Sequence, residues 1–415
     1  MSAEAGQKPI NIVLFSTLFP HRGEPTLGVF VRNRLLELLK TGEVQATVIA
    51  PVPWFPFKGK MFGVYGKAAL ADKEERQGNL KIFHPRYLVI PKLGMLLTPF
   101  TLAWAAKRCL RKLLNQGLQV DLIDAHYLYP DAISASKLSN WFGIPFVATA
   151  RGSDVSQIGK MPKPKAMIVD CCSKASHVIT VSQSLSDLLQ VMGVDANNIT
   201  TLRNGVDLKR FKRITDAKSV VCAETELDPS KPVVLFAGWL IPRKRVDILI
   251  DALPYSEDAQ ALIVGDGPLR SELKKQAAEA GVANRVAFVG KKNPEDVVKY
   301  FSAADLLCLP SEREGWANVM LEAMACGVPV VARAVDGALE LITSEKAGRL
   351  VEGSRPKAYA EAFTSILNSN HDPEEVRAFA SQFDWQATTN GQLKIFRQVL
   401  APSDSVSEQR AEQAL

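Results

Sequence analysis

Residues 233–265, VVLFAGWLIPRKRVDILIDALPYSEDAQALIVG, decide the fold class. The apolar run Val233–Gly238 is typical of a buried strand, the amphipathic run Val246–Leu253 of a helix, and Ala261–Gly265 of a second buried strand. A strand, a helix and a strand in this order form the repeating unit of a parallel sheet covered by helices. The stretch therefore predicts an α/β fold.

The same alternation continues on both sides of this stretch. Downstream it predicts further elements at Leu269–Ala280, Val286–Gly290, Pro294–Ala303, Leu306–Leu309, Val319–Ala325 and Val328–Ala332. Upstream it predicts a second set at Ile10–Ser16, Val29–Lys40, Val44–Ala50, Leu80–Phe83, Thr101–Asn115, Val120–Asp124, Phe146–Ala150, Val178–Val181 and Ser184–Val191. Two sets predict two Rossmann-like, doubly wound parallel-sheet domains, at residues 1–208 and 233–384. The polar segment 209–232 is predicted to be a linker, and the Ser-, Glu- and Gln-rich tail 402–415 to be disordered.

The length and charge are those of a globular protein with more than one domain. At roughly 150 residues per domain, 415 residues suffice for two or three. The formal net charge of +6 is unevenly divided, because residues 1–212 carry +12 and the remainder −6. The basic half contains none of the motifs of nucleic-acid modules. Its charge therefore favours phosphate-bearing substrates or an anionic membrane surface as partners, and no nucleic acid.

Neither a membrane span nor a secretory signal is predicted. The uncharged run Leu93–Ala106 has 14 residues, and a bilayer span needs roughly 20. The polar N-terminus lacks an apolar signal core, which predicts a cytoplasmic protein. The six cysteines show no C-x-x-C spacing, so we expect buried thiols rather than disulfides or metal ligands.

The turn after the first strand of each set argues against a dinucleotide cofactor. Neither Thr17–Gly28 nor Trp239–Arg245 contains G-x-G-x-x-G, the fingerprint of nicotinamide and flavin dinucleotide sites. We therefore expect no cofactor. Ligands of open parallel sheets still bind beyond the carboxyl ends of the strands, so the site is expected at these turns.

Residues 310–330, PSEREGWANVMLEAMACGVPV, carry the sharpest functional signal. A strand is predicted to end at Pro310, a polar turn carries Glu314, and a helix begins near Asn318 and carries Glu322. A carboxylate buried among apolar neighbours is costly unless hydroxyls or cations satisfy it, and sugar hydroxyls could do so. We predict that the two carboxylates converge on one pocket. The alternative is a structural glutamate bound to neighbouring backbone amides.

Several motifs together resemble the family 4 retaining glycosyltransferases of the two-Rossmann-domain (GT-B) architecture. Besides 310–330 they are Phe236–Asp247, Val264–Leu269, Phe288–Gly290, Asn204–Asp207, Ala150–Asp154 and Gly28–Asn33. The Gly28-Val-Phe and Arg151-Gly-Ser-Asp forms are most similar to the transferases of bacterial envelope and exopolysaccharide synthesis, of the teichuronic-acid type. The resemblance implies two domains that face a cleft, with a final helix, 385–401, that returns to the first domain.

The resemblance also implies an activity. A sugar would move with retention from a UDP- or GDP-linked donor to a glycan or lipid-linked acceptor, and the donor would bridge and close the cleft. No metal is expected, because the chain contains no D-x-D motif. The alternatives are another GT-B reaction, such as that of a nucleotide-sugar epimerase or a sugar phosphorylase, and a catalytically silent scaffold.

By resemblance, the second domain supplies most of the donor site. Glu322 should hold the ribose hydroxyls, while the catalytic Glu314 and the backbone amides of Gly315, Trp316 and Ala317 hold the donor sugar. Lys244, also catalytic, should contact the diphosphate. The alternative for Arg243, Lys244 and Arg245 is an ordinary solvated triplet. Trp239 stands where the family commonly has arginine, so either Arg243 or Arg151 supplies that charge or the diphosphate is bound more weakly.

The first domain is expected to contribute three residues. Gly28 matches a glycine whose backbone approaches the diphosphate, and the alternative is a purely structural turn glycine. His126 aligns with a catalytic histidine near the donor sugar, and the alternative is a histidine satisfied within the core. Arg151 replaces a histidine of many relatives with a permanent cation and is expected at the donor.

The segment Pro51–Asn115 mixes apolar residues with cations. The residues are Trp54, Phe55, Phe57, Met61, Phe62, Leu93–Leu97, Lys58, Lys60, Lys67, Lys107, Arg108, Arg111 and Lys112. Such a mixture suits an interfacial segment that collects a lipid-linked acceptor, and would place the protein peripherally on the inner face of a membrane. The alternative is a core helix with a basic outer face.

Overall fold

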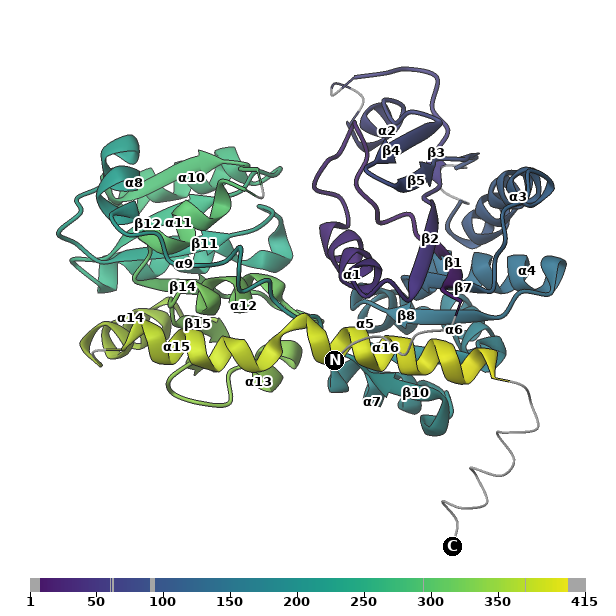
Figure 1. Ribbon diagram of the computed structural model, residues 1–415. Coiled ribbons are helices and arrows are strands. Elements are labelled where there is room, and N and C mark those ends of the chain that lie inside the picture. The colour runs from purple at the N-terminus through teal and green to yellow at the C-terminus, as the bar shows by residue number, and fades with distance from the viewer. Residues whose placement is uncertain are drawn as a thin grey trace, which may run out of the picture. The chain divides into compact units, whose positions relative to one another are not determined.

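A computed structural model describes residues 8–59, 61, 63–89, 94–293, 295–369 and 371–401 of the chain (Figure 1). The predicted disordered tail 402–415 lies outside the described residues, as do Lys60, Phe62 and Leu93 of the predicted interfacial segment. The chain divides into two compact units. One comprises the residues up to 202 together with those from 387 onward, and the other comprises residues 203–386.

The first unit is built on an eight-stranded sheet with the order β10-β9-β8-β7-β1-β2-β5-β4. The strands are β1 (Ile10–Phe15), β2 (Val44–Ile49), β4 (Glu74–Gln77), β5 (Leu80–Phe83), β7 (Leu122–His126), β8 (Phe146–Ala150), β9 (His177–Thr180) and β10 (Ile199–Thr201). Ile12 of β1 pairs with Ala46 of β2 and with Leu122 of β7, both in parallel, while β4 pairs antiparallel with β5. β3 (Val52–Pro53) and β6 (Arg86–Tyr87) form a separate pair.

Helices cover this sheet. They are α1 (Val29–Lys40), α2 (Gly63–Ala68), α3 (Gly94–Asn115), α4 (Ile133–Phe142), α5 (Ser153–Ser156), α6 (Pro162–Lys174), α7 (Gln183–Met192) and α16 (Trp385–Leu400). α3 begins at Gly94 rather than at the predicted Thr101, so the helix runs through Pro99. Proline has no N–H to donate to the carbonyl four residues earlier. The Tyr129 hydroxyl donates to that carbonyl, of Met95, instead.

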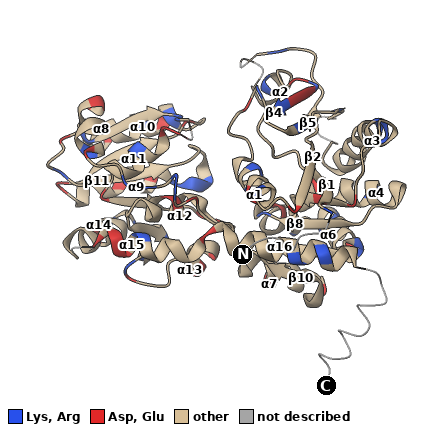
Figure 2. Cartoon of the chain, viewed as in Figure 1, with Lys and Arg blue, Asp and Glu red and all other residues tan. Residues whose placement is uncertain are grey.

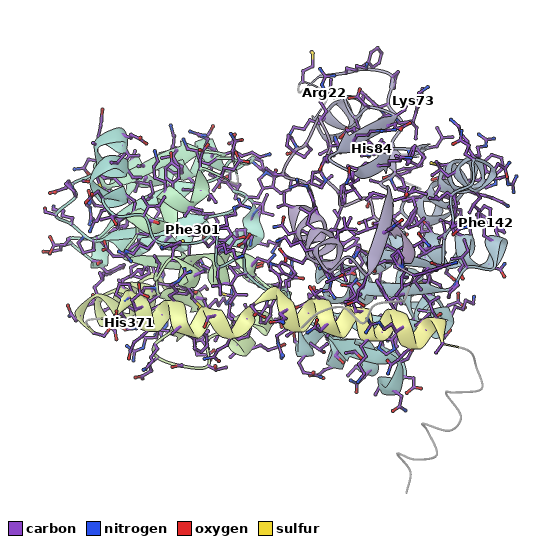
Figure 3. All side chains as sticks on the ribbon, in the orientation of Figure 1. Arg22, Lys73, His84, Phe142, Phe301 and His371 are labelled. Carbon is purple, nitrogen blue, oxygen red and sulfur yellow. The ribbon has the colours of Figure 1, made fainter. Side chains whose placement is uncertain are left out.

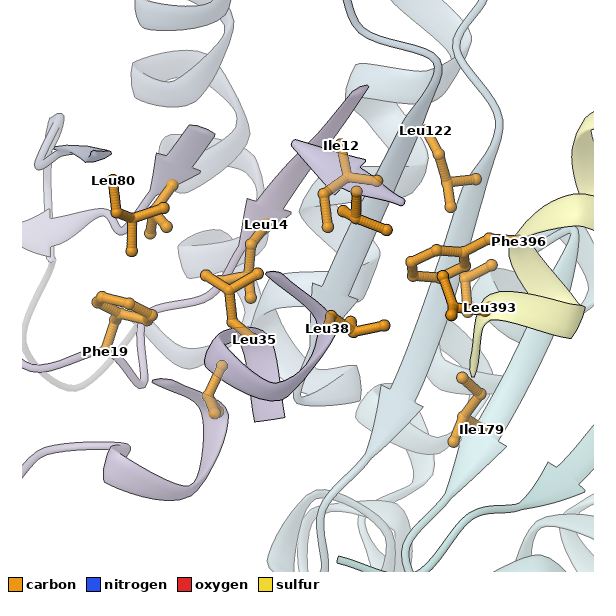
Figure 4. Packing of buried hydrophobic residues seen from close by; sticks show 14 of the residues in the cluster. Ile12, Leu14, Phe19, Leu35, Leu38, Leu80, Leu122, Ile179, Leu393 and Phe396 are labelled. Atoms are coloured by element: carbon orange, nitrogen blue, oxygen red, sulfur yellow. The ribbon is translucent and has the colours of Figure 1, made fainter. Parts of the chain in front are cut away.

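The core of the first unit joins both ends of the chain (Figure 4). Leu35 and Leu38 of α1 belong to the same buried cluster as Ile12 of β1 and as Leu393 and Phe396 of α16. The final helix therefore buries apolar side chains with the first sheet, which explains why residues after 386 belong to this unit.

The second unit contains a six-stranded parallel sheet with the order β13-β12-β11-β14-β15-β16. Its strands are β11 (Val233–Ala237), β12 (Gln260–Val264), β13 (Val286–Gly290), β14 (Leu306–Leu309), β15 (Val330–Arg333) and β16 (Gly348–Val351). Its helices are α8 (Ala217–Thr225), α9 (Val246–Ala252), α10 (Arg270–Glu279), α11 (Val297–Ala303), α12 (Asn318–Ala325), α13 (Asp336–Leu341), α14 (Pro356–Asn368) and α15 (Pro373–Ala380). Phe301 of α11 is fully buried in this unit (Figure 3). The predicted fold class is confirmed: both units are α/β with mainly parallel sheets.

The predicted linker 209–232 requires a correction, because it is part of the second unit and contains α8. α8 packs against α11, and Val221 and Cys222 of α8 are fully buried. The ring of Phe211 lies edge-on to that of Phe301, with centroids 6.0 Å apart. The polar composition concealed a helix whose apolar residues occupy one short stripe.

Replacing Val221 with alanine tests this packing. We expect the free energy of unfolding to fall by about 2 kcal/mol, because two methyl groups leave a tightly packed core. The neighbouring Val220 is 47% exposed on the same helix and provides a matched control. Val220→Ala should change stability by less than about 0.5 kcal/mol in urea unfolding curves. Equal effects of the two substitutions would contradict the packing of α8.

No helix among the described residues is long and apolar enough to cross a membrane. The cysteines in this part of the chain are all free, and five of the six are buried, as the sequence predicted.

Candidate functional site

The strand order of the second sheet reverses between β11 and β14. β12 lies on one side of β11 and β14 on the other, so the loops that leave β11 and β14 diverge from neighbouring strand ends. This switch point is where ligands of doubly wound sheets bind. The two loops are joined here: the Glu312 amide donates to the Arg243 carbonyl at 2.8 Å, and the Arg243 guanidinium donates to the Arg313 carbonyl at 3.1 Å.

Two predicted site residues, 70 positions apart in the chain, meet at this point. The Lys244 ammonium lies 2.5 Å from Oε1 of Glu314, and these side chains are only 12% and 9% exposed. Arg243 lies 3.8 Å from Oε2 of the same carboxylate. The basic triplet is therefore not a uniformly solvated one, because Lys244 turns inward while Arg245 pairs with Asp247. An inward ammonium beside a carboxylate can contact a phosphate when the carboxylate takes a hydroxyl instead.

Gly265 allows the loop after β12 to lie against the loop after β11. Its φ is +149°, and a Cβ there would lie 1.8 Å from the Gly238 carbonyl oxygen. Any side chain at this position would push the two loops apart. The loop that carries Lys244 therefore packs closely against the loop after β12.

The turn before α12 offers backbone N–H groups as hydrogen-bond donors. Within the described chain, the amides of Gly315, Trp316 and Ala317 donate to no protein acceptor. The Gly337 amide donates to the Glu314 carbonyl at 3.1 Å, which fixes the turn from the other side. Free amides at such a turn can bind an anion or sugar hydroxyls.

The Trp316 side chain has a structural position. Its indole N–H donates to the Asn204 carbonyl at 3.0 Å, and its ring packs near Phe383. The indole is thus held by residues of its own unit, and a contact of the Trp316 backbone amide with the donor sugar stays a prediction.

Glu322 lies on α12 and is partly buried among apolar residues of that helix. Burial raises its pKa to about 7, and the charge of Arg210 opposes that rise only weakly. Among the described residues, none donates a hydrogen bond to this carboxylate. A carboxyl group without a protein donor, on the helix that follows the amide turn, can accept hydroxyls of a ligand.

Ser311 was not identified from the sequence. It lies two residues after the end of β14, is fully buried, and its hydroxyl has no hydrogen-bond partner in the described chain. The position of a serine at the carboxyl end of a predicted strand was the available signal. Trp239, by contrast, is 59% exposed in the loop after β11.

The first unit has a buried polar cluster at the carboxyl ends of β7 and β8. His126 Nε2 lies 3.1 Å from Asp124 Oδ2, and the Arg151 guanidinium lies 2.5 Å from His126 Nδ1. Because arginine can only donate, Nδ1 accepts and the Nε2–H donates to Asp124. Gln392 of α16 donates to Asp124 at 2.9 Å and accepts from Arg34 at 2.7 Å.

His126 is therefore neutral and enclosed. Burial lowers its pKa to about 4, the neighbouring Arg151 lowers it further, and Asp124 opposes this shift. The residue is 1% exposed, and both ring nitrogens have protein partners. This geometry is that of the alternative stated for His126, a histidine satisfied within the core.

Gly28 has a packing role that requires glycine. Its φ is +61°, and a Cβ would lie 2.0 Å from the Leu18 carbonyl oxygen. The structural requirement is thus sufficient to explain this residue, and a contact of its backbone with a diphosphate stays a prediction.

Two buried carboxylates of the first unit were missed by sequence reasoning. Asp131 accepts from the Thr17 amide at 2.7 Å and from the Ser16 hydroxyl at 3.2 Å, and burial raises its pKa to about 7. Asp154 accepts from the backbone amides of Leu128 and Gly152 at 2.8 and 2.7 Å. Both fix the loops at strand ends. No group of three His, Cys, Asp or Glu side chains placed to hold a metal was found in the described part of the chain.

Comparison with known proteins assigns both units. Residues 222–383 match the family model of glycosyl transferases group 1, and residues 64–210 match that of glycosyltransferase family 4. A protein of Bacillus subtilis (strain 168) named for teichuronic acid biosynthesis, the glycosyltransferase TuaC, is 28% identical over 365 residues, covering 86% of this chain and 88% of its own.

Solved structures agree on the fold. Sucrose-phosphate synthase from Thermosynechococcus elongatus superposes with a TM-score of 0.75 at 21% identity, covering 94% of this chain and 99% of that one. HepE from Anabaena, in complex with UDP and glucose, gives a TM-score of 0.71 at 22% identity, covering 94% and 100%. The chain is therefore a GT-B glycosyltransferase of group 1, family 4, an enzyme that transfers a sugar from a nucleotide sugar.

Proposed function

We propose that this enzyme is a retaining glycosyltransferase that moves a sugar from a UDP- or GDP-linked donor to a glycan or lipid-linked acceptor in bacterial envelope or exopolysaccharide synthesis. The observation that carries the donor site is the meeting of Lys244 and Glu314 at the switch point of the second sheet, 2.5 Å apart. The relative named for teichuronic acid biosynthesis supports the class of acceptor.

The second unit would bind the nucleotide sugar through charges and hydrogen-bonding groups that complement it. Glu322 accepts the ribose hydroxyls, and the amides of Gly315, Trp316 and Ala317 together with Glu314 hold the sugar. Lys244 and Arg243 then meet the negative charge that builds on the leaving diphosphate. The acceptor attacks from the face that the diphosphate leaves, and the β-phosphate takes the acceptor proton.

The first unit would contribute Arg151 and the backbone of Gly28 to the diphosphate. His126 acts as a positioning residue, because it accepts from Arg151 at 2.5 Å and is itself held by Asp124. This role differs from the direct sugar contact that the family resemblance implies, and the burial of the imidazole supports the difference.

The donor is identified by incubating the protein with a panel of UDP- and GDP-sugars and measuring the free sugar and free nucleotide released. Slow release of both from one donor, faster with a glycan or lipid-linked acceptor, is the expected result. Conversion of the donor to an isomer would indicate an epimerase, and phosphate-dependent cleavage of a glycan a phosphorylase. Tight nucleotide binding with no turnover would indicate a silent scaffold.

Metal removal gives a further test of the mechanism. We expect transfer to survive an excess of EDTA, because Lys244 and Arg243 supply the positive charge that a metal supplies elsewhere. The measurement is the initial rate before and after chelation. Complete loss of activity that manganese restores would contradict this mechanism.

A further inference from the structure

α3 exposes one continuous stripe to solvent. Leu97, Phe100, Trp104, Arg108 and Arg111 recur every three or four residues, so they lie on one side of the helix. The first three are 44%, 47% and 58% exposed. The stripe is therefore apolar in its first half and basic in its second. Three large apolar side chains exposed side by side indicate a binding surface.

α4 extends this stripe. The two helices pack side by side. The Lys137 ammonium of α4 lies 4.2 Å from the centre of the Phe100 ring, and the Lys107 ammonium lies 3.9 Å from that of Trp141. We call Leu97, Phe100, Trp104, Lys107, Arg108, Arg111, Lys137 and Trp141 the α3–α4 surface.

The charge of the two helices has one sign. Residues 94–115 and 133–142 contain no Asp or Glu, whereas they contain Lys107, Arg108, Arg111, Lys112 and Lys137 (Figure 2). Arg108 and Lys112 also line a cavity of about 910 Å³ whose other cations are Lys73, Lys81 and Arg86. Ordinary solvated surfaces intersperse both signs, so this surface selects an anionic partner.

We propose that the α3–α4 surface binds an anionic lipid membrane. Tryptophan and phenylalanine enter the boundary between headgroups and acyl chains, while neighbouring lysine and arginine side chains reach the lipid phosphates. A second copy of the chain fits less well, because a twofold contact through this surface would bring the four cations of each copy together. Nucleic acid also fits less well, since cations already cover the Phe100, Trp104 and Trp141 rings on which bases would stack.

The surface begins beside the candidate site of the first unit. Tyr129 donates to the Met95 carbonyl, and Ser134 donates to the Pro99 carbonyl at 2.8 Å. Both residues follow β7, whose last residue, His126, belongs to the buried polar cluster. A membrane bound here would present a lipid-linked acceptor at the edge of the sheet where the site lies. This last step rests on the proposed function, whereas membrane binding itself does not.

Vesicle flotation of the full chain tests the proposal. We expect binding to phosphatidylcholine vesicles that contain about 30 mol% phosphatidylglycerol, weak binding to phosphatidylcholine alone, and release at high salt. Arg108→Glu with Arg111→Glu should weaken binding at least about 25-fold, at about fivefold per cation. Lys274→Glu with Lys275→Glu makes the same change in net charge on α10, a helix of mixed charge, and should bind as the wild type does.

The apolar half of the surface has its own test. Phe100→Ser with Trp104→Ser should abolish flotation and remove the blue shift of tryptophan fluorescence that vesicles cause. Val191→Ser with Tyr255→Ser removes two even more exposed apolar side chains elsewhere, 81% and 61% exposed, and should leave both unchanged. Circular dichroism melting confirms that each variant folds, and Arg108→Gln with Arg111→Gln provides a milder second variant.

Three outcomes would overturn the proposal. They are equal binding to neutral and anionic vesicles, wild-type flotation of the Arg108 and Arg111 variants, and a dimer in light scattering that Phe100→Ser with Trp104→Ser converts to a monomer. Binding of UDP and GDP, measured by calorimetry on the same variants, separates this proposal from the proposed function. A variant that no longer floats but still binds nucleotide shows that only the α3–α4 surface has been damaged. A wild type that floats but binds no nucleotide contradicts the proposed function and leaves membrane binding standing.

Discussion

Replacing Lys244 with methionine is expected to lower kcat/KM for the nucleotide sugar about 10²- to 10³-fold, the usual cost of removing one preorganised donor from a developing negative charge. Methionine keeps the length of the apolar stem and removes only the ammonium, which contacts Glu314 and is nearly enclosed. Because the charge builds as the diphosphate leaves, the loss should fall mainly on kcat. Initial rates at varied donor concentration separate the two constants.

Arg245→Met is the matched control. It removes a cation from the adjacent position, but one that pairs with Asp247 and Glu312 instead of Glu314. We expect kcat/KM to change little. If both variants lose activity equally, the effect is a general loss of positive field or of loop structure, and Lys244 has no specific place at the diphosphate.

Replacing Glu322 with alanine should weaken nucleotide binding about 10- to 150-fold. A hydrogen bond to a charged group contributes about 1.5–3 kcal/mol, and the ribose hydroxyls would lose that acceptor. Calorimetric titration with UDP and with GDP measures the effect directly. Glu312→Gln changes an exposed carboxylate in the loop before α12 and serves as the control. An unchanged affinity in Glu322→Ala would remove the ribose contact.

The pH dependence gives the same residue a second test. Burial raises the pKa of Glu322 to about 7 from its ordinary 4.5, so the acceptor form appears as pH rises from 6 to 8. Nucleotide affinity of the wild type should rise over this range relative to that of Glu322→Gln.

The stability of the nucleotide-free protein should fall as pH rises, whereas its nucleotide affinity should rise. A pKa that is higher in the folded than in the unfolded state adds stability that is fully present below about 4.5 and lost as pH rises through about 7. The wild type should therefore lose stability relative to Glu322→Gln between pH 5 and pH 8 in thermal melts. Parallel curves for the two proteins would mean that the Glu322 carboxyl group titrates normally.

The buried strands could be located from the sequence because their signal is local. Apolar runs bounded by polar turns gave β1, β5, β11 and β14 within one residue of their observed ends. The onset of α3 could not be located in this way. Its continuation through Pro99 depends on the Tyr129 hydroxyl, which comes from a distant part of the chain.

The same distinction between local sequence signals and long-range contacts applies to the candidate site. The residues of the amide turn and Glu322 lie within eight residues of one motif, so their common location could be read from the sequence. The direction of each side chain could not. The Trp316 indole turns to the Asn204 carbonyl, and His126 lies enclosed between Asp124 and Arg151. Asp131 lies in no motif, and the motif Ala150–Asp154 did not reveal the role of Asp154, since both carboxylates accept loop amides that only the folded chain brings together.

The sequence by itself determined the α/β class, the two mainly parallel sheets, the family and the loops that carry the candidate donor residues, because periodicity and motif spacing are properties of neighbouring residues. The tertiary structure alone decided that residues 209–232 belong to the second unit, which side chains of α16 enter the first core, and that Lys244 turns to Glu314. These are contacts between residues far apart in the chain. Their free energies depend on burial and on charges that local sequence patterns do not encode.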